Sequence, residues 1–120
     1  MEDEPLVLMT VRQALEDAGY GVREAGDGRE ALAVIDAEIQ TFGALVTDVN
    51  LGRIDGWAVA RHARELNPKM PVVYVTGDSA HEWASQGVPG SVLVEKPFAP
   101  AQIVTAVSSL LVVTNPSAMG

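Results

Sequence analysis

The stretch Val72-Val73-Tyr74-Val75-Thr76 decides the fold class of this chain. It is short, rich in β-branched residues, and continuously apolar rather than alternating. Strands that are buried on both faces have this pattern, which is typical of a parallel sheet covered by helices. Residues 44–47 and 92–94 have the same character, and residues 21–25 form a weaker example. The sequence therefore predicts four strands of a buried parallel sheet.

Apolar residues at helical spacing lie between these runs. A first helix is predicted from Leu8, Val11 and Leu15, beginning near Pro5 and ending before Gly19. Further helices are predicted over about 29–38, after Asp55-Gly56 until Asn67-Pro68 stops the helix, over a short stretch near 80–86, and after residue 97. The strict alternation of helices and strands indicates an α/β fold with right-handed crossovers.

Length and composition exclude several classes of protein. The chain has 120 residues, which suits one domain, and a net charge of −8 from 16 acidic and 8 basic residues. This acidic balance argues against binding nucleic acid or an anionic membrane. The absence of cysteine excludes a disulfide framework, a thiolate metal site and cysteine catalysis. No apolar run approaches the roughly 20 residues of a membrane span, and the acidic start resembles no signal peptide, so we expect a cytoplasmic domain.

Chemically active side chains follow three of the predicted strands. Asp48, Thr76 and Lys96 stand at successive strand ends, and the acidic run Glu2-Asp3-Glu4 precedes the first helix. In α/β folds, ligands bind at the carboxyl edge of the sheet. Each residue alone has a structural interpretation, as a turn, strand or solvated residue. Their coincidence at successive strand ends favours a functional site.

These residue types are suited to phosphoryl transfer. Clustered carboxylates need a cation, and hard oxygen ligands suit Mg²⁺. A carboxylate such as Asp48 can also accept a phosphoryl group, a step that depends mostly on positioning and charge neutralisation. Mg²⁺ and Lys96 could neutralise the phosphoryl oxygens, the Thr76 hydroxyl could donate to them, and Gly77 leaves room beside them.

With these residues in view, the chain resembles the receiver domain of bacterial two-component response regulators. The resemblance extends over nearly all of residues 2–111. It implies a doubly wound parallel sheet with flanking helices and the strand order 2-1-3-4-5, counted from a first strand that would precede Glu2. We expect the receiver domain over 1–113 and, because the last residues are small and polar, a flexible tail over 114–120. The motifs that carry it are Glu2-Asp3-Glu4-Pro5, Thr47-Asp48-Val49-Asn50-Leu51-Gly52, Asp55-Gly56, Val75-Thr76-Gly77 and Glu95-Lys96-Pro97-Phe98.

The resemblance implies a role for each acidic position. Asp48 matches the phospho-acceptor. Asp3 matches a direct ligand of Mg²⁺ (or Mn²⁺), and Glu2 matches a ligand that acts through water. Asn50 matches the position whose backbone carbonyl completes the metal site.

The remaining positions of the motifs match parts of a switch. Thr76 matches the hydroxyl that moves toward the phosphoryl group, and Lys96 matches the lysine that pairs with it. Pro97 matches a residue whose preceding peptide bond is often cis. Asn50 and Asp78 flank the path of the attacking water, so the resemblance implies that they tune dephosphorylation.

Three positions depart from the family pattern. Residues 51–52 are Leu-Gly, where the family usually has Met-Pro or Leu-Pro. Leu93 occupies a position where the family often has a Tyr or Phe that acts as a rotamer switch. Only Met1 stands where the family has an apolar first strand. The natural protein could begin upstream, or residues 110–113 could enter the slot in the same chain or in a neighbour, as a strand swap or homodimer. Strands 21–25 and 44–47 could also pair directly, or chains could associate in a rearranged way.

The resemblance implies a phospho-accepting signalling switch and no enzyme beyond slow self-dephosphorylation. A histidine kinase or phosphotransfer protein would supply the phosphoryl group. The helix near 80–86, the strand 92–94 and the last helix would then change and control an unidentified partner. Two alternatives remain open: a receiver-like interaction module that is never phosphorylated, and an Mg²⁺-dependent phosphatase with an aspartate nucleophile. Asn50 stands against the phosphatase, because such enzymes usually carry a second acid there.

Overall fold

The computed structural model describes residues 5–49 and 53–114. Within them, three parallel strands form one sheet in the order β1-β2-β3. The strands are β1 (Leu45–Asp48), β2 (Val72–Thr76) and β3 (Val92–Glu95). Asp48 pairs with Val75, and Thr76 pairs with Glu95, so the carboxyl ends of the strands meet at one edge of the sheet. The predicted parallel α/β fold is confirmed.

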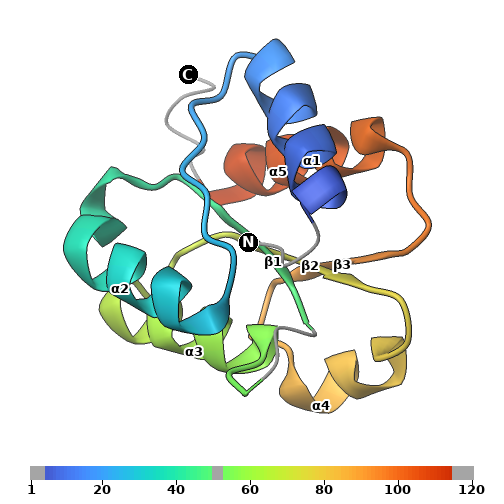
Figure 1. Ribbon diagram of the computed structural model, residues 1–120. Coiled ribbons are helices and arrows are strands. Elements are labelled where there is room, and N and C mark those ends of the chain that lie inside the picture. The colour runs from blue at the N-terminus through green and yellow to red at the C-terminus, as the bar shows by residue number, and fades with distance from the viewer. Residues whose placement is uncertain (1–4, 50–52, 115–120) are drawn as a thin grey trace.

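Helices alternate with these strands as the sequence predicts (Figure 1). Helix α1 ends close to Gly19, whose φ of +97° suits a residue without a side chain. Asp27 and Asp55 cap α2 and α3 by accepting hydrogen bonds from the N–H groups of Glu30 and Ala58. The helical elements are α1 (Pro5–Asp17), α2 (Gly28–Glu38), η1 (Ile39–Thr41), α3 (Gly56–Leu66), η2 (Ala80–Glu82), α4 (Trp83–Gln86) and α5 (Pro100–Thr114).

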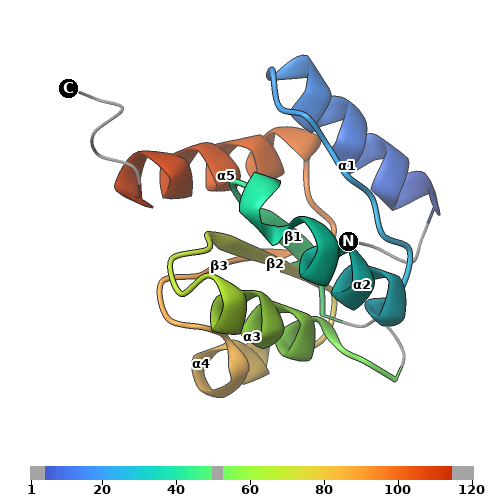
Figure 2. The ribbon, with the colours of Figure 1, turned by 90° about the vertical axis from the view of Figure 1, so that its left-hand side faces the viewer.

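The sheet lies between two layers of helices (Figure 2). Helices α1 and α5 cover one face, and α2 and α3 cover the other. Neighbouring residues of β2 serve opposite layers: Val73 packs in the core with Ile103 of α5, and Tyr74 packs in the core with Trp57 of α3. The Trp57 and Tyr74 rings lie 4.6 Å apart between centroids. Burial of both faces explains why β2 is continuously apolar.

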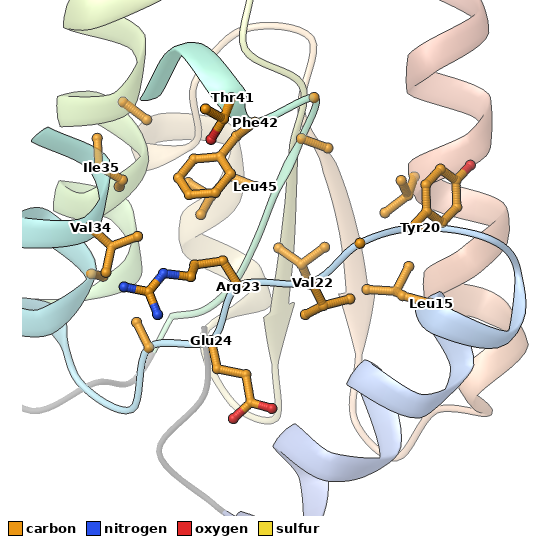
Figure 3. A pocket seen from close by; sticks show the side chains of 18 of the residues that line it. Leu15, Tyr20, Val22, Arg23, Glu24, Val34, Ile35, Thr41, Phe42 and Leu45 are labelled. Carbon is orange, nitrogen blue, oxygen red and sulfur yellow. The ribbon is translucent and has the colours of Figure 1, made fainter. Parts of the chain in front are cut away.

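Residues 21–25 do not form the predicted strand. They run extended, but they make no backbone–backbone hydrogen bond to any residue that the structure describes, and they do not pair directly with β1. A cavity of about 200 Å³ separates this segment from residues 44–46 at the start of β1, and its lining includes Val22, Ile35 and Phe42 (Figure 3). The prediction was wrong because a strand needs a hydrogen-bonded neighbour, and a local sequence pattern does not supply one.

The proposed insertion of residues 110–113 into the sheet is also wrong. These residues are helical and belong to α5, and Leu110 is buried in the core between α5 and the sheet. Unwinding them would expose that apolar surface. The helix also includes Thr114, and the rest of the expected flexible tail lies outside the described residues. Across the two described ranges, no helix has the length and apolar character needed to cross a membrane.

Candidate phospho-acceptor site

Asp48 is the buried carboxylate at the carboxyl edge of the sheet. It is the last residue of β1, and only 4% of its side chain is exposed. Lys96 directly follows β3, and its Nζ atom donates a hydrogen bond to Asp48 Oδ2 at 2.9 Å. The Lys96 side chain is 22% exposed, so solvent screens this ion pair only partly. The sequence predicted that these two residues converge, and the structure places them in contact.

The backbone at the end of the sheet holds Lys96 in this position. Its N–H donates to the carbonyl of Thr76 at 2.8 Å, which extends the pairing of β2 and β3 by one residue. The Lys96–Pro97 peptide bond is cis. Because β2 lies between β3 and β1 in the sheet, the side chain of Lys96 crosses the end of β2 to reach Asp48.

Thr76 is fully buried at the end of β2. Its Oγ1 accepts hydrogen bonds from the backbone N–H groups of Ser79, at 2.9 Å, and Asp78, at 3.3 Å. A Cβ atom added at Gly77 would lie 3.9 Å from the Lys96 Cβ, an ordinary contact, so the chain is not tightly packed at position 77. A hydroxyl, a cation and a carboxylate thus end three adjacent strands.

Two further residues shape this site, and the sequence analysis gave neither a role in it. Thr47 Oγ1 donates to the Asp48 carbonyl at 2.9 Å inside the core. A Cβ atom at Gly56 would lie 2.1 Å from the same carbonyl oxygen, so only glycine fits there. The Gly56 N–H also donates to the Val49 carbonyl at 2.8 Å. The Asp55-Gly56 pair was the available signal, although its spacing does not reveal the close approach.

Tyr74 is a buried titratable residue of β2, two positions before Thr76. Burial raises the pKa of Tyr74 above its ordinary value, and the hydrogen bond from the Val88 N–H to its hydroxyl partly opposes that rise. Leu93 pairs with Tyr74 across β2 and β3 and packs against the core on the α2–α3 side. The position that is often aromatic in the family therefore holds a partly buried aliphatic side chain.

Several predicted site residues fall outside the described part of the chain. Glu2, Asp3 and Asn50 are among them, so their positions relative to Asp48 stay predictions. Within residues 5–49 and 53–114, no group of three or more acidic or histidine side chains could hold a metal ion. Asp78 is exposed at the site edge, where its Oδ1 accepts a hydrogen bond from Ser79 Oγ at 3.1 Å.

A parallel sheet between two helical layers, with an acid, a hydroxyl and a lysine after its three strands, defines the receiver class of α/β domains. The family model of the response regulator receiver domain matches residues 1–108. The chain belongs to this family, whose members are the receiver domains of two-component systems.

Relatives of known name and structure agree with this assignment. A response regulator receiver protein from Sinorhizobium medicae is 43% identical, with a TM-score of 0.90, over 94% of this chain and 91% of that one. The probable transcriptional regulatory protein TcrX of Mycobacterium tuberculosis is 34% identical over 92% of this chain and 47% of its own length. The sensor kinase CckA of Brucella abortus is 31% identical over 92% of this chain and 12% of its own length. The chain thus spans about half or less of these curated relatives.

Proposed function

We propose that Asp48 accepts a phosphoryl group and that the domain acts as a phosphorylation-controlled switch. The observation that carries this proposal is the ion pair between the buried Asp48 carboxylate and Lys96, with Nζ and Oδ2 2.9 Å apart. A buried carboxylate normally needs a partner, and a cation at this distance can also stabilise added phosphoryl charge. Family membership supports the same role.

The chemistry balances with a phosphohistidine donor. An Asp48 carboxylate oxygen forms a bond to phosphorus while the bond from phosphorus to the donor imidazole nitrogen breaks. The imidazole nitrogen keeps the bonding electron pair and takes up a proton. At neutral pH the phosphoryl group carries about −1.5 to −2 charges in place of the single negative charge of the carboxylate, and Lys96 is positioned to attract it.

A divalent cation fits the chemistry of the acidic residues. Asp48 supplies a hard oxygen ligand, and Asp3, Glu2 through water and the Asn50 carbonyl would supply the others. Such ligands match Mg²⁺ or Mn²⁺. The ion, when bound, would neutralise charge on the phosphoryl oxygens. Within the protein, Lys96 holds the Asp48 carboxylate in place and Thr76 offers a hydroxyl beside it.

The donor we propose is a histidine kinase or a phosphotransfer protein. One of the relatives is a sensor kinase, and the others named above are a response regulator receiver protein and a transcriptional regulator. The output we propose is a change in the face formed by α4, β3 and α5, which a downstream protein would recognise. Asn50 and Asp78 would set the lifetime of the phosphorylated state.

Intact-mass spectrometry tests the acceptor directly. Incubation with a small-molecule phosphodonor and Mg²⁺ should add one phosphoryl group to the wild-type chain. Asp48→Asn should add none. Asp17→Asn, which changes an exposed aspartate at the end of α1, is the matched control and should be labelled like the wild type.

The outcomes separate the proposed switch from its alternatives. Undiminished labelling of Asp48→Asn would refute the acceptor assignment. A folded wild-type chain that is never labelled would identify a receiver-like module without phosphorylation. Rapid turnover of phosphate esters by the wild type, lost in Asp48→Asn, would identify a phosphatase.

A further inference from the structure

The Thr76 hydroxyl holds the turn that leads into α4. Its oxygen accepts hydrogen bonds from two consecutive backbone N–H groups, those of Asp78 and Ser79. The turn η2 begins with the next residue, and the Glu82 N–H donates to the Ser79 carbonyl at 3.0 Å. One buried oxygen at the end of β2 therefore fixes the start of the η2–α4 segment, residues 80–86.

Trp83 ties the other side of the η2–α4 segment to the start of β3. Its indole Nε1 donates to Ser91 Oγ at 3.0 Å, and Ser91 Oγ donates to the Val88 carbonyl at 2.7 Å. A Cβ atom at Gly87 would lie 2.5 Å from the indole Cδ1, so the ring lies directly against that glycine. Ser91 immediately precedes β3. Residue Trp83 is nevertheless 38% exposed, so it lies at the surface of the proposed output face.

The η2–α4 segment is too short to be stable without these contacts. It consists of a three-residue η2 and a four-residue α4, and isolated helices of such length are unstable in water. If the Thr76 hydroxyl turned toward a phosphoryl group on Asp48, the backbone N–H groups of Asp78 and Ser79 would lose the oxygen to which they donate. The segment would then lose its fixed start, and the single hydrogen bond from Trp83 to Ser91 would not hold so short a segment in place.

We propose that Trp83 and Ser91 form a latch that transmits the state of Asp48 to the α4–β3 face. This inference rests on the proposed function and adds the residues through which the signal leaves the site. In the unphosphorylated state Thr76 holds the η2–α4 segment and the latch is closed. Phosphorylation withdraws the Thr76 oxygen, and the indole leaves Ser91 and becomes more exposed. In this domain position 93 is leucine, so the aromatic switch that the family often has there is missing. The latch would change the surface in its place.

Tryptophan fluorescence can follow the latch in isolation. The chain has two tryptophans, and Trp57→Phe leaves Trp83 as the only indole while keeping an aromatic ring against Tyr74. Phosphodonor and Mg²⁺ should raise acrylamide quenching of Trp83 by about twofold, because the residue starts at 38% exposure and can become more exposed. In the unsubstituted chain, NMR should show one of the two indole N–H signals moving upfield as its hydrogen bond is lost.

Substitutions at both ends of the path give the matched comparison. Ser91→Ala should show raised quenching before phosphorylation and little change after it, whereas Ser91→Thr keeps a hydroxyl and should retain the response. At equal phosphoryl mass, Thr76→Ala should show no further Trp83 response, and Thr76→Ser should respond. Equal urea-unfolding midpoints within each pair would show that the difference does not come from stability.

The phosphoryl mass of the same samples separates the two levels of the argument. If Asp48 is phosphorylated while Trp83 quenching and its indole N–H signal stay unchanged, the latch is refuted and the proposed function stands. If Ser91→Ala responds like the wild type, the latch is also refuted. If no sample gains phosphoryl mass, the proposed function and the latch that rests on it both fail.

Discussion

A methyl group at position 56 measures how tightly the chain after β1 packs against the candidate acceptor. In Gly56→Ala the new Cβ would lie 2.1 Å from the Asp48 carbonyl oxygen, and that neighbour is backbone that cannot rotate away. Overpacking costs about 1–3 kcal/mol, and weakening the Gly56 N–H bond to Val49 costs about 1 kcal/mol more. The higher helix propensity of alanine returns up to about 1 kcal/mol. The unfolding free energy should therefore fall by about 1–3 kcal/mol.

Urea unfolding followed by circular dichroism gives this difference. The matched control is Gly77→Ala, whose added Cβ would lie 3.9 Å from the Lys96 Cβ, so its unfolding free energy should stay within about 0.5 kcal/mol of the wild type. Because relief of the clash moves the Asp48 backbone, Gly56→Ala should also be phosphorylated more slowly. Equal unfolding midpoints for Gly56→Ala and the wild type would refute the close packing behind Asp48.

Four further changes test other parts of the structure. Asp3→Ala removes a proposed oxygen ligand, so Mg²⁺ affinity should fall by roughly tenfold or more, and a wild-type titration curve would place the metal elsewhere. Lys96→Ala should still bind Mg²⁺ but should not transmit phosphorylation of Asp48 to the output face, which the tryptophan fluorescence measures; an unchanged response would contradict its role. The raised pKa of Tyr74 means that the unfolded chain loses its phenolic proton first, so this contribution to stability is present below pH 10 and is lost as pH rises through the folded-state pKa. Between about pH 9 and 11, Tyr74→Phe should therefore lose less unfolding free energy than the wild type, and parallel curves would argue against this effect. An apolar strand added before Glu2 should occupy the cavity beside residues 21–25, raise the melting temperature and favour a monomer, whereas a Gly/Ser extension of equal length should not; equal effects of the two extensions would show that the cavity is not a strand site.

The sequence predicted those parts of the fold that depend on local pattern. Residues 72–76 are buried on both faces, and their composition alone marks them as an inner strand. Residues 21–25 carry only two apolar side chains, Val22 and Ala25, and whether they form a strand depends on whether another strand lies beside them. Residues 110–113 suit either a strand or a helix, and burial of Leu110 against the sheet decides for the helix.

The candidate site shows the same division. Asp48 and Lys96 could be placed together because parallel strands end at one edge, a rule of topology that needs no coordinates. The close approach of Gly56 to the Asp48 carbonyl could not, because it depends on the path of the chain between β1 and α3. The acceptor role of the Thr76 oxygen toward Ser79 was also missed, since the sequence suggested only a hydroxyl that donates.

Because of the extended segment 21–25, the two sides of this domain should differ in local stability. Strand β2 is hydrogen-bonded on both sides, whereas residues 21–25 have no backbone–backbone bonds within the described chain, so their amide protons should exchange while β2 stays protected. This segment then forms a unit of low local stability, whereas β2, β3 and α5, against which α1 packs through Leu15, form a unit of high local stability. Strand β1 is bonded to β2 on one side and borders the cavity on the other, which places Asp48 at the boundary between the two units. Any ligand that orders this edge therefore tightens the part of the domain that opens most easily.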